Sequence, residues 1–335
     1  MPATIREVAR KADVSVATVS RVLNGSDSVR PATREHVLET AQALQYIPNE
    51  TARSLSQKQT RTVGVLLPDM HGQFFAQVIQ GIEEQAQAQN YHVLVSSSHS
   101  EEEEARTMIR AMLGRVDGLV IMWPKSRVPF LSETIPKGLP TILLNAPAVE
   151  GASFALNFDN RRGARNVVRH LIEHGHRRIA MLAGASENHD ARERLAGYRS
   201  ALEEADLAAD DDYVIGGDFT RESGYEAARR VLALSPSPTA LFAANDSMAI
   251  GALRGLQEED VRVPDDLALA GFDDIPTARF MMPGLTTAHV PMRRLGERAF
   301  EHLLAVLSGE APDDGGAETL ATELIRRTSC GCPPS

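Results

Sequence analysis

A group of polar and aromatic residues beyond residue 60 has the chemistry of a binding site for a small hydroxylated molecule. Carboxylate and amide oxygens accept hydrogen bonds from hydroxyl groups, a guanidinium donates in a fixed fork, and an aromatic face covers an apolar ring. The candidate set combines these types: Phe74, Phe75, Asn188, Asp190, Arg194, Phe219, Asn245 and Asp273. The residue types therefore favour a polyhydroxylated ligand.

The polar members of this set have an alternative role as helix caps, because Asp and Asn are preferred at helix N-termini. Capping is the favoured interpretation for two neighbours of the set, Asp246 and Asp274. Asp246 directly precedes a helix predicted over 247–259. Arg194 lies inside a predicted helix and caps nothing, so ligand binding is the stronger interpretation for it.

A second kind of chemistry is indicated near the N-terminus, where a short predicted helix carries small residues and one arginine. Val16 and Ala17 are small enough to approach a thymine methyl group, and Arg21 is long enough to reach guanine O6/N7 or a phosphate. This pattern favours DNA binding. The alternative is a solvated helical hairpin in which Arg21 is an ordinary surface charge.

Signatures of catalysis and of metal binding are weak. The sequence contains no dinucleotide-binding Gly-x-Gly-x-x-Gly, no P-loop and no Gly-x-Ser-x-Gly. His170, His174 and His176 are better explained as cations at a helix C-terminus that Gly175 caps. Cys330 and Cys332 offer two ligands, too few for a metal site, and are interpreted as reduced thiols. The sequence thus predicts no enzyme, no cofactor and no metal.

Three short helices must position the residues of the DNA-reading segment. Thr4 and Glu7 have the spacing of a capping box, and Ser15 is suited to cap the second helix. Pro31 suits the first position of the third helix. A three- to four-residue turn between the first two helices is typical of a helix-turn-helix.

Beyond residue 60, short apolar runs alternate with amphipathic segments, and the pattern restarts after Asp159. The runs predict strands at 63–67, 93–95, 118–122, 141–144, 179–182, 213–216, 240–243 and 267–270. Such alternation predicts two mostly parallel sheets with helices on both faces. Ligands bind such folds beyond the carboxyl ends of the strands, which is where the candidate set falls.

Ordered motifs in the first fifty residues resemble the start of a LacI/GalR-family bacterial transcription regulator. They read TIREVA at 4–9, VSVATVSRVLN at 14–24 and YIPN at 46–49, and the resemblance continues over nearly the whole chain. Arg30 departs from the family, in which Ser often precedes the third helix. The resemblance implies an α/β fold with an N-terminal three-helix helix-turn-helix module, a hinge helix and two doubly wound α/β lobes of periplasmic-binding-protein type.

The resemblance also implies the domain boundaries. The helix-turn-helix domain is expected at 1–48, the hinge helix or linker at 49–60 and the effector-binding domain at 61–335. The first lobe would comprise 61–160 and 291–322, and the second lobe 161–290 and 323–330.

Contacts with double-stranded, pseudo-palindromic operator DNA are implied for residues of the first sixty. They are Thr4, Ser15, Val16, Ala17, Thr18, Ser20, Arg21, Asn24, Asn49, Ala52, Arg53 and Leu55. Ala52 and Arg53 match hinge positions against the minor groove, and paired Leu55 side chains would wedge into a base step. A flexible linker is the alternative for 49–58.

The implied function is that of a dimeric regulator, expected to be a repressor, under the control of a small-molecule effector. Arg194 matches the family's effector-contacting arginine, Asn245 and Asp273 match residues that hold ligand hydroxyls, and the three phenylalanines match wall positions. Asp190 with Arg194 favours a sugar or sugar acid; purines and nucleosides are the alternative. Two alternative hypotheses assign the chain to other functional classes. It could be an exported solute-binding receptor with the same two lobes, or an enzyme with a regulatory domain.

The charge composition agrees with a DNA-binding segment in residues 1–60 and a different domain in the rest of the chain. The chain has 335 residues and a net charge of −10. Residues 1–60 carry eight Lys/Arg and six Asp/Glu, whereas the remainder carries 27 and 39. A weakly basic module on an acidic body fits a DNA reader joined to another domain. Two cysteines, no long apolar stretch and no secretory signal favour a cytoplasmic protein without a membrane partner.

Overall fold

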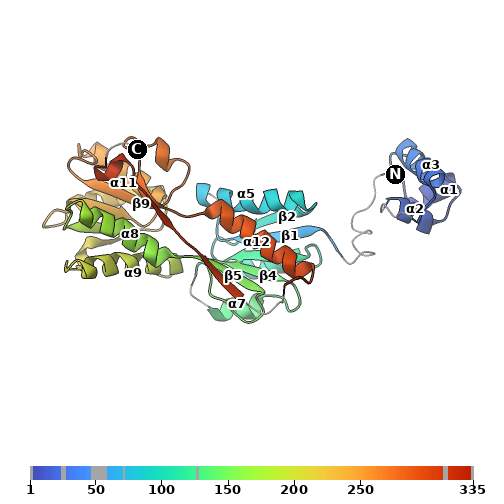
Figure 1. Cartoon of the computed structure of the whole chain (residues 1–335), viewed down its shortest axis with the longest axis horizontal. Coiled ribbons are helices and arrows are strands. Elements are labelled where there is room, and N and C mark those ends of the chain that lie inside the picture. The colour runs from blue at the N-terminus through green and yellow to red at the C-terminus, as the bar shows by residue number, and fades with distance from the viewer. Residues whose placement is uncertain are drawn as a thin grey trace. The chain divides into compact units, whose positions relative to one another are not determined.

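The computed structural model describes residues 3–23, 28–46, 59–70, 72–125, 128–311 and 316–332. The chain divides into two compact units, Met1–Thr60 and Arg61–Ser335 (Figure 1). No helix in these ranges is both long and apolar enough to cross a membrane.

The N-terminal unit contains the three expected helices, α1 (Ile5–Lys11), α2 (Val16–Leu23) and α3 (Pro31–Ala43). Its core consists of small apolar side chains, with Val8, Val19 and Val37 fully buried. Thr4 and Glu7 form the predicted capping box, and Ser15 Oγ accepts from the backbone N–H of Thr18 at 3.1 Å. Arg30 makes no side-chain cap at the start of α3, as expected from its departure from Ser.

The first lobe of the C-terminal unit is built on a six-stranded parallel sheet of order β11-β5-β4-β3-β1-β2. Its strands are β1 (Thr62–Leu67), β2 (His92–Ser97), β3 (Gly118–Met122), β4 (Thr141–Leu144), β5 (Phe154–Phe158) and β11 (Gly316–Leu320). Its helices are α5 (Gln73–Ala88), α6 (Glu102–Met112), α7 (Val128–Thr134) and α12 (Met292–Leu307).

Alternate residues of these strands point to opposite faces, and helices cover both. Val65 and Val120 pack in one cluster with Ile82 of α5 and Leu303 of α12. Leu66, Leu119 and Ile121 pack in another with Ile109 of α6. This period-two division explains why the strands read as continuous apolar runs.

The second lobe repeats the plan with a sheet of order β12-β10-β9-β8-β6-β7, in which only the edge strand β12 is antiparallel. Its strands are β6 (Ile179–Ala183), β7 (Val214–Gly216), β8 (Ala240–Ala243), β9 (Ala268–Asp273), β10 (Thr286–His289) and β12 (Glu323–Ile325). Its helices are α8 (Asn160–Glu173), α9 (His189–Glu204), α10 (Arg221–Leu232) and α11 (Asp246–Glu258), with 3-10 turns η1 (Asp211–Tyr213), η2 (Ala278–Phe280) and η3 (Thr328–Cys330).

Within the described ranges the chain passes between the lobes at three places. It leaves the first sheet after β5 for α8, returns after β10 for α12, and leaves again between β11 and β12. Figure 1 shows the last passage as the red strand segment that runs from one sheet to the other. Both lobes are therefore assembled from discontinuous parts of the sequence.

Several elements have no counterpart in the sequence prediction. Strands β5, β10, β11 and β12 contain polar or small residues within short stretches, such as Thr286 and Thr287 in β10. Helix α7 also lacked a clear apolar stripe. Gly316, which belongs to no predicted strand, begins β11.

Candidate functional site

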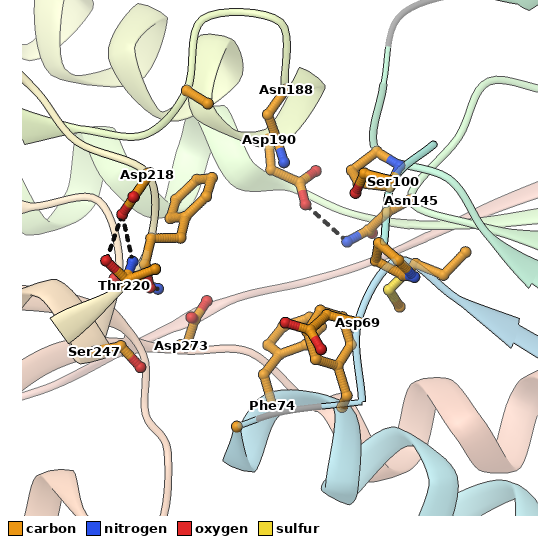
Figure 2. Close-up of a pocket in the computed structure, with 18 of the residues that line it drawn as sticks. Asp69, Phe74, Ser100, Asn145, Asn188, Asp190, Asp218, Thr220, Ser247 and Asp273 are labelled. Carbon is orange, nitrogen blue, oxygen red and sulfur yellow. Dashed lines mark hydrogen bonds between the residues drawn. The ribbon is translucent and has the colours of Figure 1, made fainter. Parts of the chain in front are cut away.

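A pocket of about 330 Å3 lies between the two lobes, at the carboxyl ends of their strands (Figure 2). Cavities of this size suit small ligands. The lining includes all eight residues of the predicted effector set: Phe74, Phe75, Asn188, Asp190, Arg194, Phe219, Asn245 and Asp273. Asp69 and Gln73 also line it. The structure thus brings residues from 74 to 273 into one cavity.

Several groups fix the guanidinium of Arg194 in this pocket. Its Nη1 lies 3.1 Å from Asp273 Oδ1 and donates to the carbonyl oxygen of Ala244 at 2.6 Å. Its Nε donates to Asn160 Oδ1 at 2.9 Å, and its Cζ lies 4.0 Å from the ring centroid of Phe272. With the side chain 4% exposed, the position of the charge is set before any ligand arrives.

Asp190 is buried, and both of its carboxylate oxygens accept hydrogen bonds from side-chain amides, one from each lobe. Its two carboxylate oxygens accept from Asn145 Nδ2 at 2.9 Å and from Asn160 Nδ2 at 3.0 Å. Burial raises the pKa of Asp190, while the nearby Arg194 charge opposes that rise. Figure 2 shows Asp190 and Asn145 pointing toward each other.

Asp273 is a buried carboxyl group at the end of β9, in strained backbone. Burial raises the pKa of Asp273 to about 7, against the opposing effect of Arg194. Asp273 and the following Asp274 have φ angles of 112° and 57°, in the left-handed region that residues with side chains rarely adopt. Such strain is retained where the surrounding structure requires it, commonly at functional sites.

Two buried acceptors in the pocket lining have no hydrogen-bond donor among the described residues. They are Oδ1 of Asn145, and Oδ1 of Asp273, whose near cation is Arg194 Nη1 at 3.1 Å, a nitrogen that already donates to the carbonyl oxygen of Ala244. A buried acceptor left without a donor costs free energy. Both residues are therefore arranged to receive donors from elsewhere.

Aromatic rings form part of the pocket wall on both sides. Phe74 packs edge-on against Phe75, with ring centroids 5.3 Å apart. Phe219 has a φ of 72°, and its ring lies so close to Gly184 that a Cβ there would overlap it. Asn245 Nδ2 holds this loop by donating to the carbonyl oxygen of Phe219 at 3.0 Å.

Asn188 and Asn245 cap helices as well as line the pocket. Asn188 Oδ1 accepts from the N–H of Ala191 at the start of α9, and Asn245 Oδ1 accepts from that of Met248 at the start of α11. Their side chains are therefore fixed by the helices that carry them.

The predicted capping roles of Asp246 and Asp274 are wrong. Asp246 is the first residue of α11, after the Asn245 cap, and accepts from Thr287 Oγ1 at 2.6 Å and from the N–H of Ile275 at 2.9 Å. Asp274 accepts from Arg327 Nη2 at 2.7 Å and from His289 Nδ1 at 3.0 Å. Both carboxylates tie β10 and the tail to the end of β9, a tertiary role that spacing alone could not indicate.

Sequence reasoning also missed several lining residues. They are Ser100, Lys125, Asn145, Asp218, Thr220 and Ser247. Asn145 directly follows β4, so the rule that ligands bind beyond strand ends could have found it. Lys125 and Asp218 lie in loops, where no periodic pattern marks them.

The lobes contact each other at both edges of this pocket. At one edge Asn145 donates to Asp190, and the N–H of His189 donates to the carbonyl oxygen of Pro124 at 2.7 Å. At the other, Gln73 Oε1 accepts from the N–H and the hydroxyl of Thr277 at 3.0 and 2.9 Å. These hydrogen bonds hold the lobes in the present arrangement.

The residues of α2 that are predicted to contact DNA divide by face as the helical period predicts. Val16 is 42% exposed, and Ala17 and Arg21 are also exposed, whereas Val19 and Val22 are buried. Thr4 and Ser15 use their side chains in caps, and Thr18 Oγ1 lies 2.9 Å from Ser15 Oγ. Ser20 lies on the same helix. The predicted contacts Asn24, Asn49, Ala52, Arg53 and Leu55 lie outside the described residues.

Two family models match the chain. Residues 4–49 match the model described as bacterial regulatory proteins, lacI family, and residues 168–330 match a periplasmic binding protein-like domain. Catabolite control protein A of Priestia megaterium is 37% identical over 93% of this chain and 95% of its own. The HTH-type transcriptional repressor PurR of Erwinia tasmaniensis is 34% identical over 99% and 98%.

Solved structures extend this similarity to three dimensions. The lac repressor dimer bound to operator and the anti-inducer ONPF has a TM-score of 0.88 at 31% identity, covering 98% of this chain and 99% of that one. The transcriptional regulator CelR in complex with cellobiose has a TM-score of 0.73 at 32% identity, with the same coverage. Both solved structures are of transcription regulators with a bound small molecule, and the chain belongs to the lacI family of bacterial regulatory proteins.

Proposed function

We propose that the chain is a cytoplasmic transcription repressor whose affinity for operator DNA is set by a sugar or sugar acid bound between its lobes. Two buried acceptors of the pocket, Asn145 Oδ1 without a donor and Asp273 Oδ1 beside Arg194, carry the ligand assignment. Hydroxyl groups donate to such oxygens. The fixed guanidinium of Arg194 supplies a donor for a ring oxygen or a carboxylate.

The regulatory mechanism follows from the order of the parts along the chain. The DNA-binding helix-turn-helix domain comes first, the hinge segment second and the two lobes that form the ligand cleft last. A ligand that contacts both lobes favours one closure of the cleft over another, and so shifts the population of the two states. In a dimer this moves the two first lobes relative to each other and decides whether paired hinge segments can form on a pseudo-palindromic operator. By reciprocity, operator DNA changes effector affinity by the same factor.

A purine or nucleoside is the second candidate ligand. Phe74, Phe75 and Phe219 offer ring faces on which a base could stack. Similarity to purine-named repressors also supports this candidate. The carboxylate-rich lining favours the hydroxylated ligand over it.

The deciding experiment is a thermal-shift screen of the full chain against sugars, sugar acids, purines and nucleosides. A ligand at 100 times its Kd stabilises by about 2.7 kcal/mol, which is readily seen. We expect a sugar or sugar acid to raise Tm in the wild type and in Arg199→Ala, which changes an exposed arginine of the same helix outside the pocket. Arg194→Ala should abolish the shift.

Operator binding at saturating ligand then tests the coupling. We expect the ligand to change operator affinity by about 5–150-fold, the usual range of allosteric coupling. Unchanged affinity would refute the regulatory mechanism. A purine or nucleoside hit would instead overturn the ligand class and leave the regulator assignment in place.

A further inference from the structure

Four metal-binding side chains meet at the surface of the second lobe, away from the ligand pocket. His170 and His174 lie at the end of α8, and Cys330 and Cys332 lie in the C-terminal segment. We call these four residues the tail cluster. His170 Nε2, Cys330 Sγ and Cys332 Sγ lie within 4.8 Å of one another, and Cys332 Sγ also lies 3.3 Å from His174 Nε2.

The fold, not chance proximity, brings these residues together. His170 and His174 are four residues apart and share one face at the helix end. Ser329 anchors the tail, since its hydroxyl donates to the carbonyl oxygen of Leu269 at 2.6 Å and accepts from the N–H of Thr286 at 2.8 Å. Gly331 between the cysteines has a φ of 85°, which lets the chain turn so that both sulfurs approach the histidines.

Separations within the tail cluster match a tetrahedral metal site. The distances are 3.4 Å from His170 Nε2 to each sulfur and 3.3 Å between the sulfurs. Zinc bonds of about 2.3 Å to sulfur and 2.0–2.1 Å to nitrogen, at tetrahedral angles, place ligand atoms roughly 3.3–3.8 Å apart. His170 Nε2 and the two sulfurs therefore already stand close to the spacing that one zinc-sized ion requires, and His174 Nε2 stands at that spacing from Cys332 Sγ.

Surrounding groups orient the ligands as metal sites commonly do. The Nδ1–H of His174 donates to the carbonyl oxygen of His170 at 3.0 Å, because a carbonyl can only accept. This hydrogen bond fixes the tautomer and leaves the lone pair on Nε2, the atom that faces Cys332. Thr286 Oγ1 lies 3.0 Å from Cys330 Sγ and donates its hydrogen to the carbonyl oxygen of Arg327 at 2.9 Å, which holds the backbone beside the cysteine in place. Such partners fix the direction and basicity of metal ligands.

We infer that the tail cluster is a structural site for a divalent ion of the zinc class, with two thiolate and two imidazole ligands. Four protein ligands leave no open position, which is typical of structural rather than catalytic zinc. The ion would join the end of α8 to the tail that follows β12. It would thus fasten the last segment of the chain to the second lobe, independently of any ligand in the pocket.

The first test is the metal content of the full chain, expressed with zinc in the medium and purified under reducing conditions without chelators. We expect about one zinc per chain by mass spectrometry of the metals. Replacing zinc with Co2+ should give the intense visible spectrum of tetrahedral thiolate-bound cobalt. A chelator should remove the metal and lower Tm, because metal binding to the native state stabilises it.

Variants locate the ion. Cys332→Ser and His174→Gln change a half-buried and an exposed ligand, so the fold should tolerate them. Each should weaken Co2+ binding by at least about 10–100-fold, the range that even supporting residues of metal sites show. His176→Gln is the matched control, since His176 lies two residues beyond His174 and contacts Thr239 Oγ1 at 3.1 Å instead. It should bind Co2+ as the wild type does.

Three results would overturn this inference. The full chain could bind neither zinc nor cobalt stoichiometrically, or Cys332→Ser could bind the metal as tightly as the wild type. The mass of the protein prepared under reducing conditions could also be two hydrogens below that of the dithiol form, which would show a Cys330–Cys332 disulfide. None of these results bears on the effector screen, so the two proposals fail separately.

Discussion

Asp273 and Arg194 form an ion pair at the centre of the pocket, with side chains only 7% and 4% exposed. Burial disfavours the charged carboxylate more strongly than the single arginine favours it, and the pKa of Asp273 rises from 3.8 to about 7. The folded protein therefore holds a proton on Asp273 that the unfolded chain releases at lower pH. The contribution of this group to the free energy of unfolding is complete below pH 3.8 and is lost as pH rises through 7.

The first prediction follows from this shift. The wild type should lose stability relative to Asp273→Asn as pH rises from about 5 to 8, because the variant has no carboxyl group to ionise. Tm measured for both proteins across that range gives the difference directly. Asp266→Asn is the control: hydrogen bonds from Arg262 lower the pKa of exposed Asp266 to about 2, so its difference from wild type should stay constant. A constant difference for Asp273→Asn as well would mean that Asp273 stays ionised.

The second prediction at this scale concerns Arg21 on the exposed face of α2. Arg21→Ala should weaken operator binding by about 1–3 kcal/mol and relax sequence preference at one base pair, because a long guanidinium can bind a guanine edge. Binding to the operator and to single-base variants at fixed salt measures both effects. Equal weakening on every DNA sequence would show that Arg21 holds only a phosphate.

Helix α2 depends on a single side-chain cap, and this gives a prediction at the scale of the element. Ser15→Ala removes the acceptor for the N–H of Thr18 and should destabilise the N-terminal unit by about 1 kcal/mol. Ser15→Gly should cost only a few tenths of that figure, since Gly is tolerated at the cap. Amide hydrogen exchange of α2 in the full chain reports the loss as faster opening. If the amides of α2 exchange as slowly in Ser15→Ala as in the wild type, the cap does not stabilise α2.

Elements with a strong local signal were predictable from the sequence, and elements defined by their neighbours were not. The capping box of α1, the Ser15 cap of α2 and the Pro31 start of α3 follow from short-range patterns, as do the apolar strands and the amphipathic helices. Strand β11 has no such pattern, because Glu318 and Thr319 face solvent or the partly buried edge of the sheet. It forms only because β5 offers it a partner.

The same distinction applies to the sites. The pocket residues could be found because strand ends of a parallel sheet converge, a rule that needs no coordinates. The tail cluster could not be found, because His170 and Cys330 are 160 residues apart and meet only through the packing of the tail. The roles of Asp246 and Asp274 were misread for the same reason: their partners, Thr287 and Arg327, are distant in sequence.

At the scale of the whole C-terminal unit, hydrogen bonds between the lobes set the closure of the cleft. Thr277→Val removes one of the two bonds to Gln73 without changing the pocket lining. We expect the sugar or sugar acid to bind about 2–10-fold more weakly, since one hydrogen bond contributes roughly 0.5–1.5 kcal/mol. Calorimetric titration measures this change. Thr107→Val is the control, because the hydroxyl of Thr107 donates within α6, and it should leave the affinity for the ligand unchanged. Equal affinity in the two variants would show that ligand binding does not depend on the hydrogen bond between Thr277 and Gln73.

The order in which the chain is made gives the interlaced lobes a further consequence. Within the C-terminal unit a ribosome makes β1–β5 before the second lobe, but the sheet of the first lobe gains its covering helix α12 and its edge strand β11 only after β6–β10 have been made. The second lobe, apart from β12 and the tail, is complete by His289. Domains generally fold as units while they emerge. The lobe whose strands are made first is therefore completed last, and until then the apolar sheet face that α12 covers stays exposed in the nascent chain.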